Sequence, residues 1–510
     1  MATVARLACR AQMGLSAPLV QVEVTLASGL PVFYIVGLPA TVVKESRERV
    51  RAALLSCGFE YPAGRIIVNL APAEIPKEGG RFELPMALGI LVASGQLAPQ
   101  PAAPLCELYG ELSLDGELKP VRGILLAAAH ARGDGHELIV PSANLKEALI
   151  VAAGHVRAAG HLKEVCDHWA GRASLPPGRA SFRPPAPARG STPDLTEVRG
   201  QLQAKRALLI AAAGSHSLLM IGPPGSGKSM LAQRLPGLLP SLTHSEALEC
   251  AGIASVSTAG FNPGAFGERP FRSPHHTASA IALVGGGAQA RPGEISLAHH
   301  GVLFLDELPE FDRRVLEALR EPLEAGIVTV SRAAMQAEYP AAFQLIAAMN
   351  PCPCGHQGDP GANCRCTPAQ VRNYRARISG PLLDRLDMHV EVPRLTAGDF
   401  NEGLRGEASA VLAERVARVR ALQLQRQGRC NARLTDAQVD RWCAPDAGAR
   451  ALLDQAMQRL RLSARARQRI LKLARTIADL DGRPDITVPH VGEAVMLRCM
   501  DREPATSSCP

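Results

Sequence analysis

A phosphate-binding loop constrains this chain more than any other feature of its sequence. The apolar run Leu218–Ile221 leads into the letters GPPGSGKS, and the residues that follow are typical of a helix. Strand, G-x-x-x-x-G-K-S loop and helix in this order are typical of nucleotide-binding α/β proteins. The glycines let backbone N–H groups turn toward phosphates, and the helix N-terminus adds positive potential. We therefore expect an α/β fold class with a parallel sheet that binds ATP.

Two side chains of this loop have specific predicted tasks. Lys228 is expected to reach the β- and γ-phosphates, and the Ser229 hydroxyl to bind Mg²⁺. A glycine-rich turn that binds no nucleotide is the alternative. The residues predicted to bind the nucleotide are Gly222, Pro223, Pro224, Gly225, Ser226, Gly227, Lys228, Ser229 and Asp306.

Two carboxylates follow a second apolar run, Val302–Leu305. Open α/β sheets bind ligands at the carboxyl ends of their strands, where Asp306 and Glu307 would lie. We expect Asp306 to hold Mg²⁺ together with Ser229, and Glu307 to orient and activate the attacking water. Asn350 follows a third apolar run and can position the same water, or it can simply start the turn before Pro351.

Four cysteines crowd into 15 residues that are rich in Gly and Pro: Cys352, Cys354, Cys364 and Cys366. Four thiolates can hold one Zn²⁺ tetrahedrally, in a structural site with no open position. The C-x-C spacing is tighter than the usual C-x₂-C, so reduced thiols in a loop remain the alternative. The pairs His275-His276 and His299-His300 make poor chelates, because neighbouring side chains point apart; we interpret them as structural.

Composition changes along the chain suggest its organisation. Residues 1–170 have mixed α/β patterning, 171–193 are a proline-rich linker, 194–393 hold the nucleotide motifs, and 394–510 are helical. No apolar run reaches the length of a membrane span, and no secretory signal begins the chain. The odd count of 13 cysteines then indicates reduced thiols and a cytoplasmic location.

Several longer segments resemble a known family. They are PHHT at 274–277, GGG at 285–287, RPGEISLA at 291–298, NPCPCG at 350–355, and 379–387. Together they are similar to the ComM/YifB family of magnesium-chelatase-like AAA+ ATPases. The resemblance implies a Lon-protease-like N-terminal domain, an AAA+ core and a helical lid. It also implies hexamers and ATP-driven work on branched DNA, including natural transformation.

The resemblance assigns two further arginines. Arg385 matches the finger that reaches the ATP of the next subunit, and Arg465 is similar to the second sensor arginine. A structural ion pair of Arg385 with Asp384 or Asp387 is the alternative. The resemblance also implies an inserted hairpin near residues 260–287.

A second hairpin is plausible over residues 327–339, where Val328 and Val330 alternate with polar residues. Such hairpins line the central pore of related motors. Arg332 is then a candidate phosphate contact, or an ordinary solvated side chain.

The N-terminal region resembles the two catalytic segments of Lon. A Ser–Lys dyad needs a serine nucleophile and a lysine base. Here Arg81 or Phe82 stands at the position of the nucleophile, and Leu125 at that of the lysine. We expect a proteolytically inactive module for assembly or docking.

Basic charge concentrates in residues 411–475, which carry 15 basic and five acidic side chains, whereas the whole chain has a net charge of +8. Arg465, Arg469 and Lys472 are expected on one helix face. A basic domain beside a motor core suits contact with a phosphate backbone, although a solvated lid face explains it equally well.

Three functions compete. An ATP-dependent DNA motor, a hexameric helicase or branch-migration factor in recombination or natural transformation, is our leading hypothesis. The alternatives are the ATPase subunit of a metal-chelatase-like complex and a regulatory or proteolytic AAA+ protein. The missing Ser–Lys dyad disfavours the protease. The N-terminal domain and the cysteine cluster disfavour the chelatase, whose motor subunits lack both by resemblance.

Overall fold

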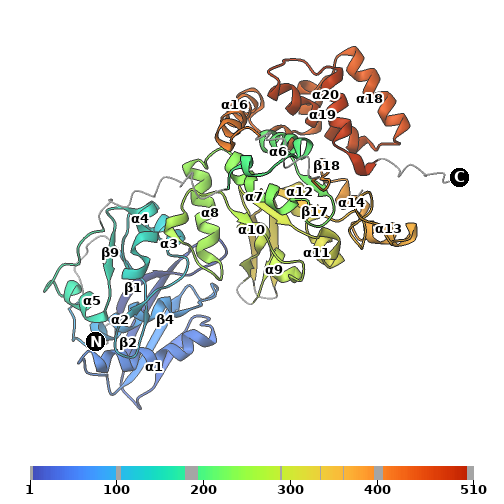
Figure 1. Cartoon of the computed structure of the whole chain (residues 1–510). Helices are drawn as coiled ribbons and strands as arrows, with labels where there is room; N and C mark the ends of the chain where they lie inside the picture. The colour runs from blue at the N-terminus through green and yellow to red at the C-terminus, as the bar shows by residue number, and fades with distance from the viewer. Residues whose placement is uncertain are drawn as a thin grey trace. The chain divides into compact units, whose positions relative to one another are not determined.

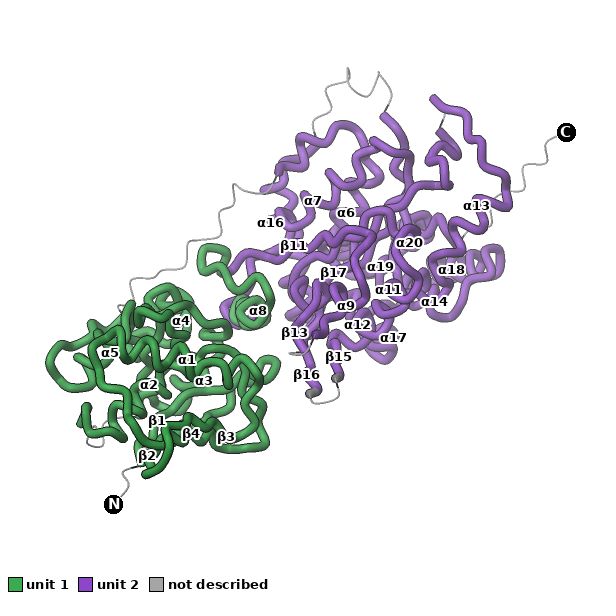
Figure 2. Tube along the Cα trace, turned by 90° about the horizontal axis from the view of Figure 1, so that it is seen from below, with its two compact units in different colours: residues 1–186, 247–266 green, residues 187–246, 267–510 purple. Residues whose placement is uncertain are grey.

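The computed structural model describes residues 4–98, 105–178, 193–287, 290–332, 335–359, 361–395 and 406–501. The backbone divides into two compact units (Figure 2). Unit 1 comprises residues 1–186 and 247–266, and unit 2 comprises residues 187–246 and 267–510. Most of the predicted linker, residues 179–192, lies outside the described residues. Within the described ranges, no helix is both long and apolar enough to cross a membrane.

Unit 1 is built on a seven-stranded mixed sheet in the order β3-β4-β2-β1-β5-β8-β9. Buried and more exposed residues alternate in β2, where Val20, Val22 and Val24 are fully buried. The strands β1–β2 and β2–β4 pair antiparallel, and the other pairs are parallel. The strands are β1 (Ala5–Arg10), β2 (Leu19–Ala27), β3 (Phe33–Val36), β4 (Arg65–Ala71), β5 (Cys106–Leu108), β8 (Glu137–Pro141) and β9 (Val156–Ala159).

The helices of unit 1 include one that is buried along almost its whole length. In α2, every residue from Glu83 to Val92 is buried, and Pro85 lies in the first turn, where a proline needs no N–H. A short hairpin, β6 (Glu111–Leu112) and β7 (Leu118–Lys119), completes the unit. The helices are α1 (Thr41–Ser56), α2 (Glu83–Ala93), α3 (Ile124–Gly133), α4 (Leu145–Ala152), α5 (Leu162–Trp169) and most of α8 (His244–Val256).

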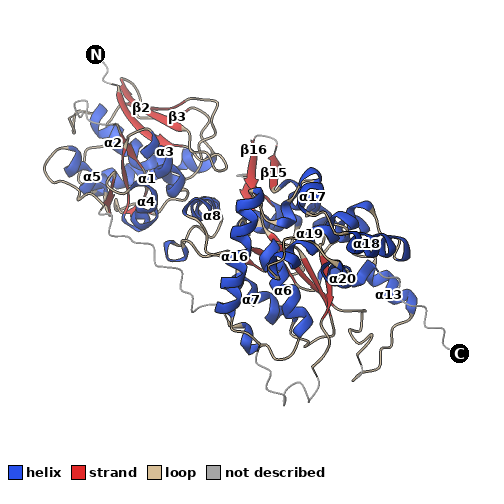
Figure 3. Ribbon diagram, turned by 90° about the horizontal axis from the view of Figure 1, so that it is seen from above, coloured by secondary structure: helices blue, strands red, loops and turns tan. Residues whose placement is uncertain are grey.

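Unit 2 contains a five-stranded parallel sheet in the order β11-β14-β17-β10-β18. The three predicted apolar runs form β10, β14 and β17, and their side chains are buried on both faces, as a covered parallel sheet requires. Helices flank this sheet (Figure 3). The strands are β10 (Leu218–Ile221), β11 (Phe271–Arg272), β14 (Val302–Leu305), β17 (Gln344–Met349) and β18 (Met388–Glu391).

The C-terminal helices share one hydrophobic core with this sheet. Ile470, Leu473 and Ile477 on α19 are fully buried in the same cluster as Leu218 and Ile346 of the sheet. These three residues therefore lie on the buried face of α19. Figure 1 shows α19 beside α6 (Leu202–Gly214). The helices around the sheet are α6 (Leu202–Gly214), α7 (Lys228–Leu238), α9 (Ala280–Val284), α10 (Glu294–Leu297), α11 (Arg313–Ala318), α12 (Arg320–Ala325), α13 (Pro368–Arg375) and α14 (Gly380–Leu383). The C-terminal helices are α16 (Ser409–Gln427), α17 (Asp436–Trp442), α18 (Ala447–Arg459), α19 (Ala464–Leu480) and α20 (Val488–Met496).

The two expected hairpins differ in outcome. Strands β15 (Ile327–Arg332) and β16 (Met335–Pro340) pair antiparallel, so the second hairpin is confirmed. Residues 260–287 instead form short turns, β11 and α9. Strand β12 (Gly285–Gly286) pairs with β13 (Arg291–Pro292), which lies beyond the expected range. Frequent Gly and Pro residues in this segment explain why no long strand forms.

Candidate active site

The phosphate loop adopts the conformation that its glycines permit. Gly225 and Gly227 have φ angles of +76° and +91°, in the left-handed region that favours glycine. A Cβ on Gly222 would lie 2.1 Å from the carbonyl oxygen of Val392, so glycine is required there for the close approach. Helix α7 begins at Lys228, directly after the loop.

Lys228 lies under the loop and is largely buried. Its Nζ donates to the carbonyl oxygens of Gly222 at 2.7 Å and Pro223 at 2.9 Å, and to Asn350 Oδ1 at 3.4 Å. Burial lowers the pKa of Lys228, while the carboxylates of Asp306 and Glu307 act in the opposite direction. A phosphate would give the Lys228 ammonium a charged hydrogen-bond acceptor. A hydrogen bond to such an acceptor is stronger than one to a carbonyl oxygen.

The predicted Mg²⁺ residues lie in direct contact. Ser229 Oγ, in the first turn of α7, donates to Asp306 Oδ2 at 2.6 Å, at the carboxyl end of β14. A hydroxyl and a carboxylate oxygen are hard ligands of the kind that Mg²⁺ prefers beside substrate phosphates. The donor set therefore fits the ion.

Asn350 and the two acids meet because their strands are neighbours. β17 lies between β14 and β10, with Leu305 opposite Ala347 and Ile221 opposite Met349. The carboxyl ends of these three strands therefore meet at one edge of the sheet.

Glu307 has an unusual backbone and an unpredicted partner. Its φ is +53°, a conformation that residues other than glycine seldom adopt outside special sites. Its Oε2 lies 3.0 Å from Nδ1 of His276, whose ring meets Phe311 edge-on at 6.5 Å. The sequence placed His276 among structural residues, and no spacing rule links it to a carboxylate 31 positions away.

Arg385 takes a partner other than the two that the sequence suggested. Its Nη2 lies 2.6 Å from Glu324 Oε1 on α12, and its Nη1 donates to the Pro381 carbonyl oxygen at 2.8 Å. The side chain of Arg385 is 9% exposed and that of Glu324 is 56% exposed. The role of Arg385 as a finger stays a prediction.

Asp387 contacts groups other than Arg385. It accepts hydrogen bonds from the Ser217 N–H at 3.0 Å and its Oγ at 3.1 Å, and it pairs with Arg469. Burial alone would raise the pKa of Asp387, but Arg469 and His216 hold it well below its usual range. An ion pair between Asp387 and Arg385 is therefore not formed in this structure.

The expected basic face of α19 is mostly turned inward. Arg465 is exposed on the first turn. Arg469 pairs with Asp387, and Lys472 Nζ donates to the Leu434 carbonyl oxygen at 2.6 Å. Of the three predicted cations, only Arg465 is left at the surface.

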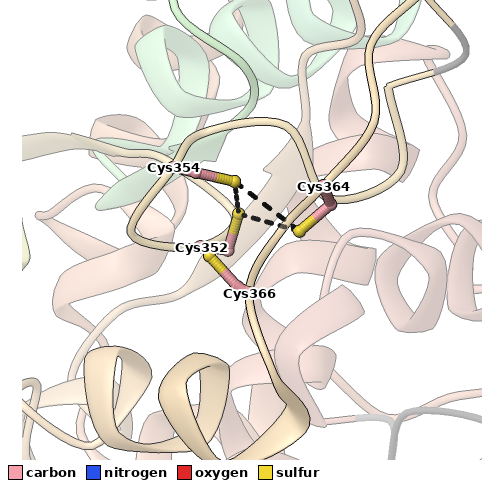
Figure 4. A group of neighbouring side chains, drawn as sticks. All are labelled: Cys352, Cys354, Cys364 and Cys366. Carbon is pink, nitrogen blue, oxygen red and sulfur yellow. Dashed lines mark hydrogen bonds between the residues drawn. The ribbon is translucent and has the colours of Figure 1, made fainter.

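The four cysteines converge (Figure 4). The Sγ atoms of Cys352, Cys354 and Cys364 lie 3.4–3.7 Å apart, and that of Cys366 lies within 4.8 Å of them all. Four thiolates at ~2.3 Å from a tetrahedral zinc would be separated by about 3.8 Å. The donor set and its spacing therefore fit Zn²⁺.

The cysteine loop also contacts the phosphate loop. A Cβ on Gly355, whose φ is +83°, would lie 2.7 Å from Cδ of Pro224. The loop begins directly after Asn350. The conformation of the cysteine loop therefore affects both the phosphate loop and Asn350, the residue predicted to position the water.

Comparisons with known proteins agree with this geometry. A Haemophilus influenzae protein named Competence protein ComM is 49% identical over 496 residues, covering 97% of each chain. The chain belongs to the ComM/YifB family of magnesium-chelatase-like AAA+ ATPases. An Escherichia coli protein named YifB is 47% identical over 494 residues, covering 97% of this chain and 96% of that one. Membership of this ATPase family implies ATP and Mg²⁺ as cofactors.

Magnesium chelatases themselves match less of the chain. The 38 kDa magnesium-chelatase subunit of Cereibacter sphaeroides is 27% identical over 169 residues, which is 30% of this chain and 51% of that protein. Family models described as magnesium chelatase, subunit ChlI, match residues 194–400, and its C-terminal part matches 406–498. A model described as subunit ChlI of Mg-chelatase also matches residues 22–144. This last match removes the N-terminal domain as a reason to reject the chelatase alternative.

Proposed function

We propose that this chain is an ATP-dependent DNA motor, a hexameric helicase or branch-migration factor that acts in the cytoplasm during recombination or natural transformation. The observation that carries the proposal is the end-to-end similarity to a protein named for competence, in a chain whose ATP-site residues lie together. We take the competence role in that protein's name to point to DNA as the partner on which this ATPase acts.

The chemistry is ATP hydrolysis. Lys228 would bind the β- and γ-phosphates, and Ser229 and Asp306 would hold Mg²⁺, which would neutralise phosphate charge when bound. Glu307 takes a proton from the water as the water oxygen bonds to the γ-phosphorus. The bond from that phosphorus to the bridging oxygen breaks, and ADP leaves with the electron pair. Asn350 orients the same water.

Ring assembly would complete this site. Lys228 and Mg²⁺ counter the ground-state phosphate charge, but transfer spreads further charge over the γ-phosphoryl oxygens. In our proposal the Arg385 guanidinium of a neighbouring subunit supplies the missing cation, after exchanging Glu324 for phosphate. Arg465, which is exposed on α19, would contact the nucleotide from the lid.

DNA contact is proposed for two surfaces. One is the hairpin β15–β16, on which Arg332 ends the first strand; its side chain lies outside the described residues. The other is a set of exposed arginines in the C-terminal helices and the turns between them: Arg418, Arg429, Arg441, Arg450, Arg459, Arg461 and Arg465. Aromatic residues are few there, so backbone contact rather than base stacking is expected.

The cysteine cluster is proposed to bind one structural Zn²⁺. Four thiolates fill the coordination sphere, which leaves no position for substrate. Through the contact between Gly355 and Pro224, the metal would hold the phosphate loop and Asn350 in register.

The second candidate function is the ATPase subunit of a metal-chelatase-like complex, because all three matching family models carry chelatase names. Hydrolysis rates with single-stranded, duplex and branched DNA separate the two. A DNA motor is stimulated by its track, whereas a chelatase motor is not.

A further inference from the structure

Strand β3 (Phe33–Val36) ends the sheet of unit 1 and has one free edge. It pairs in parallel with β4, and among the described residues no strand pairs with its other side. Such an edge carries backbone N–H and C=O groups that a further strand can bond, so folded proteins commonly guard it with charged residues or proline. The four residues of β3 include neither. The edge is therefore chemically open to a further strand.

Large apolar side chains are exposed at every second position along this segment. They are Leu30, Val32, Tyr34, Val36 and Leu38. Successive side chains of a strand point to opposite faces of its sheet, so Tyr34 and Val36 share one face of β3. They are 48% and 46% exposed. Clustered apolar surface on a folded chain marks a site of interaction with another molecule.

A pocket of about 540 Å³ adjoins the start of this strand. Val32 and Phe33 contribute to its wall from the start of β3, Leu55 from α1, and Tyr61 from the loop between α1 and β4. Pockets that enclose small ligands have volumes of roughly 300–1,000 Å³. This one is therefore large enough to enclose an apolar side chain of a bound segment.

Arginines supply the polar part of this pocket. Arg47 and Arg51 lie one helical turn apart on α1, and both line the pocket. Arg51 lies over the Tyr61 ring, with its Cζ 5.3 Å from the ring centre. Arg47 pairs with Glu48 at 3.3 Å, but both side chains are exposed and such a pair contributes little. Arg65 begins β4 and lies over the tyrosine ring of β3 at 5.8 Å. The pocket wall and the exposed ring beside it thus carry three cations and one carboxylate.

We propose that β3 and this pocket bind an extended acidic segment of a partner protein, which adds a strand to the free edge of the sheet. In this mode of binding, backbone hydrogen bonds supply affinity and alternate side chains supply specificity. Apolar residues of the segment would cover the exposed side chains of β3, and its carboxylates would pair with Arg47, Arg51 and Arg65.

Charge and side-chain chemistry favour this occupant over two others. A second copy of the chain, paired strand to strand through β3, would bring the same three arginines to the interface, where like charges repel. Single-stranded nucleic acid binds through cations and aromatic rings, so it would leave the aliphatic side chains Leu30, Val36 and Leu38 without a role. The inference does not depend on DNA or on ATP hydrolysis.

Selection of displayed random peptides on the full chain tests the chemistry of the partner. We expect the enriched peptides to alternate acidic residues with β-branched or aromatic ones, because such sequences form strands and match the arginines. Arg51→Glu should bind these peptides about tenfold or more weakly, the effect of losing one hydrogen bond to a charged group. Lys146→Glu reverses an exposed charge of unit 1 outside this pocket and should leave the affinity unchanged. Fluorescence anisotropy measures the affinities.

Two further measurements separate strand addition from other modes of binding. An enriched peptide that is N-methylated at alternate positions loses the donors along one edge, and binding should fail for the set of positions whose donors face β3. Hydrogen exchange of residues 33–36 should slow when the unmethylated peptide binds. If Arg51→Glu does not keep the melting temperature of the wild type, Arg47→Gln takes its place.

Three outcomes would overturn the proposal. The first is a selection that enriches no peptide on the wild type over Arg51→Glu, or only peptides that leave residues 33–36 unprotected. The second is binding of oligothymidylate that is lost in Arg51→Glu while no peptide is selected, which would assign the surface to nucleic acid. The third is a fall in the mass of the assembly in Tyr34→Lys while no peptide is selected, which would assign the surface to a second copy of this chain.

Discussion

Replacing Arg385 by Ala separates a catalytic finger from a structural ion pair. In the folded chain Arg385 contacts Glu324, whose side chain is 56% exposed. Ion pairs with one exposed partner contribute about 1 kcal/mol or less to stability. A finger that stabilises the transferring phosphoryl group contributes ~10³-fold in rate, about 4 kcal/mol of activation free energy. The substitution should therefore change turnover far more than thermal stability.

The partner residue supplies the control. Glu324→Gln breaks the same ion pair but keeps the cation. We expect Arg385→Ala to bind ATP and lose about 10³-fold in kcat, while Glu324→Gln keeps kcat within a few-fold of wild type. Steady-state ATPase rates, nucleotide binding and melting curves are measured for both. Equal losses in the two variants would refute the finger and leave a structural ion pair.

A mixing experiment tests whether Arg385 acts on a neighbour. Arg385→Ala chains and Lys228→Ala chains are each expected to be inactive, for different reasons. A mixed ring contains interfaces with one intact Lys228 and one intact Arg385, so mixing should restore part of the activity. If mixing does not restore ATPase activity, and the mass of the assemblies shows that both chains are present, Arg385 acts within its own subunit.

Three further predictions concern Glu307, His276 and the cysteine cluster. Glu307→Gln should bind ATP normally and lose about 10²-fold or more in turnover, because it cannot accept a proton; wild-type turnover would remove it as the base. His276→Ala should raise DNA-free turnover by up to about tenfold, because it frees the Glu307 carboxylate from one hydrogen bond, and His276→Asn should restore the low rate; unchanged rates would make the contact incidental. Metal analysis should find about one zinc per wild-type chain and none when the four clustered cysteines become Ser, and equal contents would exclude the site.

The sequence predicted the parts of the fold that local pattern determines. The strands of the core sheet are short apolar runs, and the phosphate loop has a fixed spacing of glycines, lysine and serine. Neighbouring strands then had to bring Asp306 and Asn350 to one edge of the sheet, which is why the closeness of these two candidate residues could be predicted from the sequence.

Contacts between distant segments could not be predicted in this way. The pairing of Glu307 with His276 and that of Arg385 with Glu324 depend on how loops of unrelated sequence pack. The number of basic residues in 411–475 also overestimates the positive charge at the surface. Arg469 pairs with Asp387, and Lys472 donates to the Leu434 carbonyl oxygen. Burial of a long cation is a tertiary property that helical periodicity does not encode.

The placement of α8 is another such case. Its sequence follows the phosphate-loop helix, and the predicted domain boundaries left it in the ATPase core. The structure places residues 247–266 in unit 1 instead. The deciding contacts join Ser255 to residues more than a hundred positions earlier, and no local pattern reports them.

We propose that ATP hydrolysis drives movement of this chain on DNA. The most direct measurement follows strand displacement from a labelled branched DNA alongside ATP hydrolysis, over a salt series, with Lys228→Ala as the inactive control. We predict that branched DNA stimulates hydrolysis, that strands separate only with ATP and intact Lys228, and that rising salt weakens DNA stimulation as phosphate contacts are lost. Hydrolysis that is indifferent to every DNA at low salt, with no strand displaced, would contradict the account and favour the chelatase alternative.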